Sequence, residues 1–116
     1  LVVDDEEAIR VLLAKMLRTL GYHVDVCADG VEAVEFFTGH ADETDLVILD
    51  LMMPRMGGEE TFRRLRQLRA DARILLVSGF TRNRIVETLI QEGAVGFLAK
   101  PFQMKTIGSE MKRHLG

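Results

Sequence analysis

The stretch that decides the fold is Asp45-Leu46-Val47-Ile48-Leu49-Asp50, in which four consecutive apolar residues run into an acid. An unbroken apolar run of this length is typical of a central strand that helices cover on both faces, and such strands belong to parallel sheets. In open parallel sheets, ligands bind in the crevice outside the carboxyl ends of the strands. Asp50 is therefore expected at the ligand-binding edge of the sheet.

Two further apolar runs end on charged residues in the same way. Residues 1–3 precede Asp4 and Asp5, and residues 96–99 precede Lys100 and Pro101. If all three runs are parallel strands, three carboxylates and one ammonium group converge at one end of the sheet. That combination suits a divalent cation, an acyl phosphate and a counter-ion.

The rest of the chain alternates between strand and helix patterns. Strands are predicted at residues 1–3, 23–27, 46–49, 74–77 and 95–98, and the alternation in residues 23–26 suits an edge strand. Apolar residues at helical spacing predict helices over residues 9–20, 31–37, 62–68, 85–90 and 104–115, and Gly21 and Gly93 are expected to end the first and the fourth. Strands joined by such helices form right-handed crossovers and a parallel sheet. We therefore expect one α/β domain over residues 1–116.

Length, charge and cysteine content exclude several classes of protein. With 116 residues, 47% of them hydrophobic, the chain can build one core, and its formal charge of −3 argues against direct binding to nucleic acid. No apolar run approaches the roughly 20 residues of a membrane helix, so no membrane contact is expected. Cys27 is interpreted as a small apolar residue at a strand end, and a single cysteine fits a reducing, cytoplasmic compartment. The chain begins without Met inside a predicted strand, so we expect it to be part of a longer polypeptide.

Each charged position also has a purely structural interpretation. Asp4, followed three residues later by Glu7, resembles a helix-capping box. Asp50 could begin a turn with Pro54, and Lys100 could be a solvated strand end. Capping alone does not explain why the most apolar strand also ends on an acid.

Taken together, these positions resemble the receiver domain of two-component response regulators. The matching residues are Asp4-Asp5, Asp50, Ser78 and Lys100-Pro101, together with the loop 52–58 and Phe97. Segments 77–80 and 96–102 look most like the receivers of hybrid sensor histidine kinases. The resemblance covers essentially the whole chain. It implies a flavodoxin-like, doubly wound (βα)5 domain whose parallel five-stranded sheet has the order 2-1-3-4-5.

The resemblance implies a phosphorylation site at the acidic cluster. Asp50 would be the nucleophile that accepts a phosphoryl group from a histidine of a partner protein. Asp5, Asp50 and the backbone carbonyl of Met52 would hold Mg²⁺, and Asp4 would act through a coordinated water. Because Mg²⁺ usually keeps several of its waters, few protein ligands are enough.

Further residues are implied as catalytic and switch elements. Lys100 would neutralise phosphoryl oxygens, and Ser78 would donate a hydrogen bond to one of them after transfer. Phe97 would turn inward into the space that Ser78 leaves. The change would be transmitted to the face formed by residues 85–90, 95–98 and 104–115. The resemblance also implies a cis peptide bond before Pro101.

The implied function is a phosphoacceptor signalling switch that catalyses only its own phosphorylation and dephosphorylation. Its partner would be a histidine kinase or a histidine phosphotransfer protein, and it could be part of a larger multidomain chain. Two alternatives are a degenerate receiver that only binds partners and an aspartate-nucleophile phosphatase. The first has no need of the full set of charged residues. The second needs an acid two residues after the nucleophile, where this chain has Met52.

Charges and histidines outside the cluster are interpreted as surface features. Glu59 and Glu60 precede Arg63 and Arg64 by four residues, so the basic stretch 63–73 is interpreted as a salt-bridged, solvated helix face. The three histidines, at positions 23, 40 and 114, are expected at the surface.

The face of the first helix opposite its apolar stripe carries Ala8, Val11, Ala14, Lys15 and Arg18. An exposed Val11 is unremarkable by itself. Small side chains and two cations beside the aspartates also suit a docking surface for a histidine-bearing helical bundle.

Overall fold

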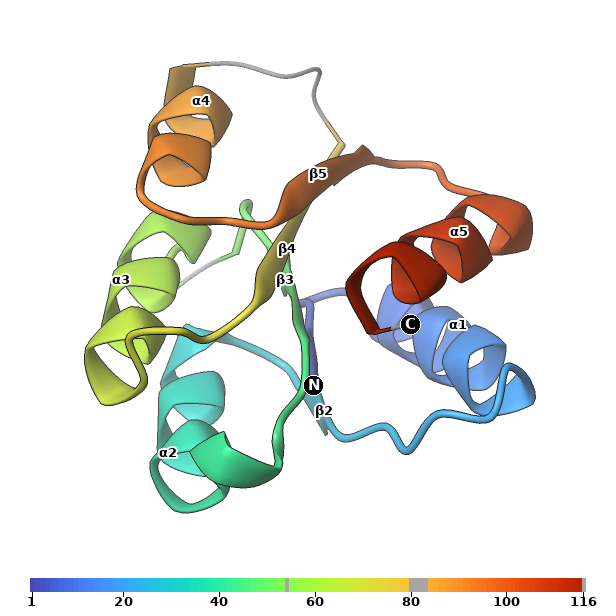
Figure 1. The fold of residues 1–116 in the computed structure, drawn as a ribbon, viewed down its shortest axis with the longest axis horizontal. Coiled ribbons are helices and arrows are strands. Elements are labelled where there is room, and N and C mark those ends of the chain that lie inside the picture. The colour runs from blue at the N-terminus through green and yellow to red at the C-terminus, as the bar shows by residue number, and fades with distance from the viewer. Residues whose placement is uncertain (54, 80–83, 116) are drawn as a thin grey trace.

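A computed structural model describes residues 1–53, 55–79 and 84–115 of the chain. Strands and helices alternate along it (Figure 1), in the order β1 (Val2–Val3), α1 (Glu7–Thr19), β2 (Val26–Cys27), α2 (Gly30–His40), η1 (Ala41–Glu43), β3 (Val47–Asp50), α3 (Gly58–Leu68), β4 (Ile74–Ser78), α4 (Arg84–Gln91), β5 (Gly96–Ala99) and α5 (Met104–Leu115). Each predicted strand and helix is confirmed, with ends that differ by a few residues. Pro54, Phe80 and Gly116 lie outside the described residues.

The five strands form one parallel sheet in the order β2-β1-β3-β4-β5, which confirms the predicted topology. The central strand β3 is buried along its whole length, as its apolar sequence indicates. The register pairs Asp50 with Val77 and Ser78 with Ala99. The ends of β3, β4 and β5 therefore lie level with one another, and the charged residues that follow or finish them share one edge.

Helices cover both faces of the sheet (Figure 1). α2, α3 and α4 lie on one face, where Phe37 and Phe62 pack against Leu49 and Leu76. α1 and α5 lie on the other face, where Leu17 and other apolar residues pack against the alternate strand positions. Because successive strand residues point to opposite faces, a sheet covered on both sides buries every position of its central strands.

The orientation of α1 corrects part of the predicted helix faces. Leu12 and Leu20, expected in the core stripe, are each 42% exposed. Ala14, expected on the outer face, is buried against the sheet. Ala14 lies three residues before the buried Leu17 and therefore on the same side of the helix. Val11 is 61% exposed, in agreement with the prediction.

Backbone geometry sets the ends of several elements. Gly21 and Gly93 follow α1 and α4 with φ of +97° and +115°, the left-handed region that favours glycine. The edge strand β2 is shorter than predicted, because only Val26 and Cys27 pair in register with β1. Asp25 contributes one further link, since its carbonyl accepts from the amide of Val2 at 2.9 Å.

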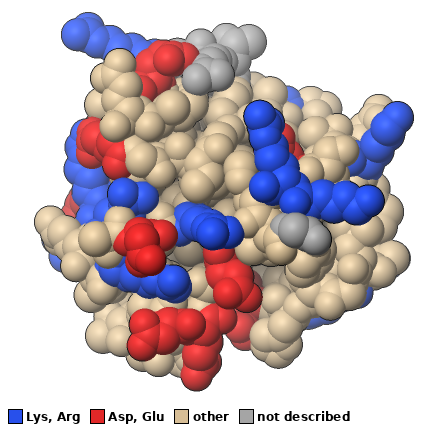
Figure 2. Space-filling model, viewed as in Figure 1, with Lys and Arg blue, Asp and Glu red and all other residues tan. Residues whose placement is uncertain are grey.

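The interpretation of residues 63–73 as a solvated, salt-bridged helix face is confirmed for Arg63 and Arg64, but not for Arg66 and Arg69. These two are partly buried and donate to the backbone carbonyls of Ala72 and Ala41. Arg63 lies 3.4 Å from Glu59, and Arg64 lies 3.2 Å from Glu60. Figure 2 shows acidic and basic side chains mixed over the viewed face. No helix in the described ranges is long and apolar enough to cross a lipid bilayer.

The expectation of three surface histidines is wrong for one of them. His23 and His40 are exposed, but the side chain of His114 is only 11% exposed. Its Nε2 lies 3.0 Å from Oε2 of Glu110, one helical turn earlier. A Cβ added to Gly96 would lie 3.7 Å from this nitrogen, so β5 lies close to the ring and helps to cover it.

Candidate functional site

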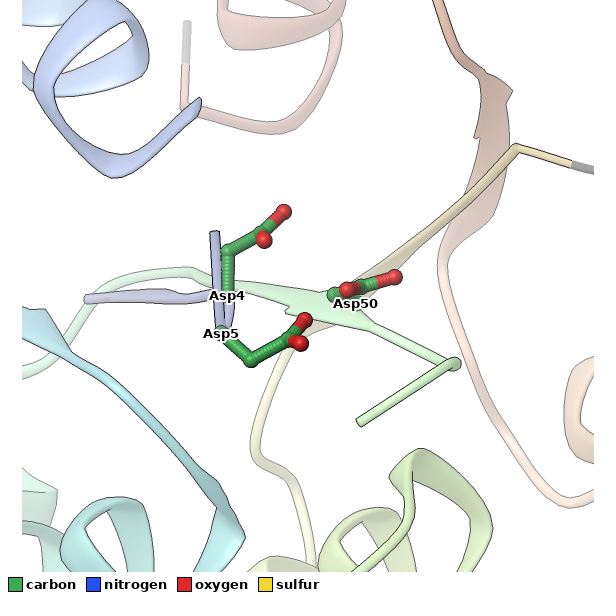
Figure 3. A group of neighbouring side chains, drawn as sticks. All are labelled: Asp4, Asp5 and Asp50. Carbon is green, nitrogen blue, oxygen red and sulfur yellow. The ribbon is translucent and has the colours of Figure 1, made fainter. Parts of the chain in front are cut away.

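Three carboxylates meet at the carboxyl ends of β1 and β3. Asp4 and Asp5 follow β1 and Asp50 ends β3, and Figure 3 shows their side chains pointing toward one shared space. Their ligand oxygens lie within 4.8 Å of one another. Asp4 and Asp50 are each 2% exposed, whereas Asp5 is more open to solvent. Closely spaced carboxylate oxygens are the ligands that Mg²⁺ prefers, so this donor set fits the ion.

Lys100 supplies the counter-charge to this cluster. Its Nζ lies 2.9 Å from Oδ2 of Asp4, 3.5 Å from Oδ2 of Asp50 and 3.6 Å from Oε1 of Glu6. Burial lowers the pKa of this ammonium group, but the hydrogen bond with Asp4 and the charge of Asp50 outweigh burial, and the pKa is raised. Lys100 therefore stays charged and is not a solvated strand end. The peptide bond to Pro101 is cis, the isomer that the resemblance implies.

The carboxyl group of Asp50 is strongly perturbed. Its pKa is raised from 3.8 to about 7, first by burial and then by the negative charge of Asp4, against the opposing effects of the Met52 amide and Lys100. Lys100 alone therefore does not offset the crowding of the carboxylates. The electrostatics of the cluster favour a further positive charge.

Asp4 is engaged through both of its carboxylate oxygens. Oδ2 contacts Lys100, and Oδ1 accepts from the backbone amide of Glu6 at 2.9 Å. The capping-box interpretation is wrong, because the N-cap residue of α1 is Glu6 and it has no side-chain cap bond. Arg10, in the first turns of α1, donates to the carbonyl of Asp4 at 2.8 Å and ties the helix to the site.

The loop after β3 folds back against Asp50. The amide of Met52 donates to Oδ1 of Asp50 at 3.2 Å, and the amide of Gly58 donates to the carbonyl of Leu51 at 3.2 Å. A Cβ at Gly58 would lie 2.4 Å from Cα of Leu51 and 2.8 Å from the carbonyl oxygen of Asp50. Only glycine leaves room for α3 to start this close to the site.

Ser78 and Phe97 lie on the neighbouring strands β4 and β5, Ser78 at the carboxyl end and Phe97 two residues before Ala99, the residue that pairs with Ser78. Ser78 ends β4 and is 2% exposed, and its carbonyl accepts from the amide of Lys100 at 2.8 Å. Phe97 is half-buried and pairs in register with Leu76. Because residues two apart on a strand share a face, Ser78 lies on the same face as Leu76, toward α3 and α4, where Phe97 packs.

A second charged pair beside the loop was missed in the sequence. Nη1 of Arg55 lies 2.8 Å from Oδ2 of Asp29, the N-cap residue of α2. Asp29 and Glu32 have the spacing of a capping box, so the N-cap was detectable from the sequence. Oδ1 of Asp29 accepts from the amide of Glu32, whereas Oε1 of Glu32 accepts from the amide of Ala28, one residue before the N-cap. The partnership with Arg55 was not, because 26 residues separate the two.

Cys27 agrees with its interpretation as an apolar residue at a strand end. It is 6% exposed, and burial, with a smaller effect from Glu32, raises its pKa to about 11. The thiol is therefore protonated at neutral pH and a poor nucleophile.

Comparison with known proteins places this geometry in a family. The family described as response regulator receiver domain matches residues 1–112. The chain is 36% identical over 115 residues to the sensor kinase CckA of Brucella abortus (strain 2308), which covers 99% of the chain and 12% of that kinase. It spans about half the length of other curated relatives that it matches.

Solved structures show the same architecture. The receiver domain of a hybrid histidine kinase CckA is 33% identical with a TM-score of 0.84, and the match covers 99% of this chain and 96% of that one. The response regulator TrrA of Thermotoga maritima, crystallised with Mg²⁺ and BeF, is 35% identical with a TM-score of 0.83, over 97% of this chain and 94% of that one.

Proposed function

Because the chain belongs to the response regulator receiver domain family of two-component signalling, we propose that it is a phosphoacceptor switch with Asp50 as the phosphorylated residue. The observation that carries the proposal is the crowding of three carboxylates beside Lys100 at one sheet edge. Asp50 is the member of this cluster whose pKa is raised toward 7 by burial and then by Asp4. A structural role has no need of such unfavourable crowding.

In the proposed reaction, a carboxylate oxygen of Asp50 attacks the phosphorus of a phosphohistidine. The new P–O bond forms as the P–N bond breaks, and the electron pair leaves on the imidazole nitrogen of the donor. Phosphoryl transfer depends mainly on positioning and neutralisation of charge. The ammonium group of Lys100, 3.5 Å from Asp50, is placed to stabilise negative charge on the phosphoryl oxygens.

We propose that Asp5 and Asp50, with the backbone carbonyl of Met52, hold Mg²⁺ and that Asp4 acts through a coordinated water. Both oxygens of Asp4 already have protein partners, which favours Asp5 as the direct ligand. When bound, Mg²⁺ would neutralise charge on the phosphoryl oxygens. Because the protein supplies only two carboxylates and one carbonyl and waters complete the coordination, the affinity for Mg²⁺ should be weak.

We propose that Ser78 and Phe97 relay the phosphorylation. A phosphoryl group adds about −1.5 to −2 of charge and strong acceptor oxygens. Ser78, at the end of the strand beside β3, would donate to one of these oxygens, and Phe97 would move into the space that it leaves. Both residues face α3 and α4, so the change should appear on the face formed by α4, β5 and α5.

The phosphodonor is proposed to be a histidine kinase or a histidine phosphotransfer protein that docks on α1. A groove of about 680 Å³ runs along α1, with Val11 and Val26 as apolar lining and Lys15 and Arg18 among its charged residues. Arg10 also lines it and contacts the carbonyl of Asp4, so the groove adjoins the site. The similarity to the sensor kinase CckA, of which the match covers 12%, favours a multidomain hybrid kinase as the parent protein.

The proposal is tested by labelling the protein with acetyl phosphate in the presence and absence of Mg²⁺. We expect one phosphoryl group per chain, dependent on the metal and lost in Asp50→Asn. The amide has nearly the same shape as the acid but cannot form the acyl phosphate at an ordinary rate. Stoichiometric labelling of Asp50→Asn would falsify the assignment of the nucleophile, and an unlabelled wild-type protein would indicate a receiver that only binds partners.

A further inference from the structure

The N-terminus of α2 supports the loop that follows β3. Asp29, the N-cap residue of α2, is 6% exposed, and both of its carboxylate oxygens are used. Oδ1 accepts from the amide of Glu32 at 2.9 Å, and Oδ2 lies 2.8 Å from Nη1 of Arg55. A buried carboxylate is thus held in place on one side by the helix and on the other by the loop.

The same helix end contacts the loop and α3 with no space left for a side chain. A Cβ at Gly30 would lie 2.0 Å from Oγ1 of Thr61 and 2.9 Å from the carbonyl oxygen of Met56. The hydroxyl of Thr61, which is fully buried, donates to the carbonyl of Gly57 at 2.8 Å. The position of Met56 and Gly57 is therefore defined by α2 and α3 together.

Arg55 adopts a backbone conformation that residues other than glycine usually avoid. Its φ is +66°, in the left-handed region, and it is the one described non-glycine residue with positive φ. A residue with a Cβ persists in this region only where surrounding contacts determine the conformation. Arg55 lies three residues after Met52, whose amide contacts Asp50.

We propose that the ion pair between Arg55 and Asp29, the latch, holds the Met52 segment in the conformation that binds the metal and thereby sets the affinity for Mg²⁺. Both residues are positioning residues, since neither is proposed to touch the ion. The inference rests on the proposed function of the acidic cluster. Without the latch the loop populates other conformations, and the apparent dissociation constant rises in inverse proportion to the binding-competent fraction that remains.

Two substitutions separate the latch from a simple effect of charge. Asp29→Asn keeps the helix cap, because asparagine caps as well as aspartate, but it offers no anion to Arg55. Arg55→Gln removes the cation. If the two side chains acted on Mg²⁺ only through the long-range electrostatic field of their charges, Arg55→Gln would strengthen its binding and Asp29→Asn would weaken it. The latch instead requires that both substitutions weaken it.

The experiment is a titration of the metal-free protein with MgCl₂, followed by backbone amide chemical shifts. For wild-type protein we expect saturable binding. Asp29→Asn and Arg55→Gln should each raise the dissociation constant about fivefold, which corresponds to about 1 kcal/mol. The double variant should be no weaker than either single one, because they share one interaction. Arg55→Lys should recover part of the loss.

Arg64→Gln is the matched control. It removes the same charge as Arg55→Gln and breaks an exposed ion pair with Glu60, 3.2 Å long, on the outer face of α3. We expect its dissociation constant to equal that of the wild type. Urea unfolding of all variants without metal measures the contribution of each pair to folding.

Three outcomes overturn the latch. Unchanged or tighter binding by Arg55→Gln means that the ion pair does not position the loop. Loss of unfolding free energy in Asp29→Asn and Arg55→Gln with an unchanged dissociation constant means that the pair only stabilises α2. In both cases wild-type binding leaves the proposed function standing. If wild-type protein binds no Mg²⁺, the proposed function fails and the latch fails with it.

Discussion

Replacing Asp50 by Asn should make the metal-free protein more stable, by an amount that grows as pH rises from about 4 and levels off above about pH 7. The pKa of Asp50 is raised from 3.8 to about 7, by burial first and by the charge of Asp4 second. A carboxyl group with a raised pKa binds its proton more tightly in the folded than in the unfolded chain, so folding stability falls as pH rises between these two values. Asparagine has no charge and escapes this loss.

The size of the effect follows from the same values. A pKa difference of about three corresponds to about 4 kcal/mol, at 1.36 kcal/mol for each unit of pH. The carboxyl edge of the sheet is partly solvated, since Asp5 is partly exposed to water. Screening by solvent should therefore reduce the gain in unfolding free energy to about 1–2 kcal/mol. For a domain of this size, that corresponds to a melting temperature higher by about 4–8 °C at pH 8. At pH 4 and below, the difference should vanish.

The assay is thermal and urea unfolding with EDTA at pH 4, 6 and 8, for the wild-type protein and Asp50→Asn. Asp42→Asn is the control, because Asp42 is an exposed acid of η1. Its stability should follow the wild type across this range. A variant Asp50→Asn that is equal to or less stable than the wild type at pH 8 would refute the argument that carboxylate crowding destabilises the fold.

Three further predictions concern the metal, the donor and the switch. Asp5→Ala should weaken Mg²⁺ binding more than Asp4→Ala, because both oxygens of Asp4 already have protein partners; the reverse order in a calorimetric titration would contradict the ligand set. Val11→Asp should slow transfer from the cognate phosphohistidine donor and leave labelling by acetyl phosphate unchanged, and equal slowing with both donors would mean damage to the site itself. Addition of beryllofluoride with Mg²⁺ should change the chemical shifts around Ser78 and Phe97, and unchanged shifts over residues 84–110 would mean that no switch reaches this face.

The sequence alone determined which residues reach the site. Asp4, Asp5, Asp50 and Lys100 each end or follow an apolar run, and in a parallel sheet all such ends lie at one edge. The period of the apolar pattern and the right-handedness of crossovers are enough to predict this common edge. The order of the strands could not be obtained in this way, because periodicity does not determine which strands are neighbours. The predicted order came from the family resemblance.

Tertiary structure alone decided how the charges pair. Lys100 lies closer to Asp4 than to Asp50, 2.9 Å against 3.5 Å. Differences of this size depend on the stagger of three strands and on the side-chain rotamers, which local sequence patterns do not encode. The raised pKa of Asp50 follows from the same packing, since burial and the nearness of Asp4 are its largest causes.

The same physical limit explains what the sequence missed. A helical pattern predicts a face to within a residue or two, so Ala14 was assigned to solvent although α1 buries it against the sheet. The burial of His114 depends on how closely α5 packs over Gly96, and the ion pair of Arg55 with Asp29 joins segments 26 residues apart. Periodicity predicts what each segment forms and which face it buries, but contacts between distant segments exist only after the layers have packed.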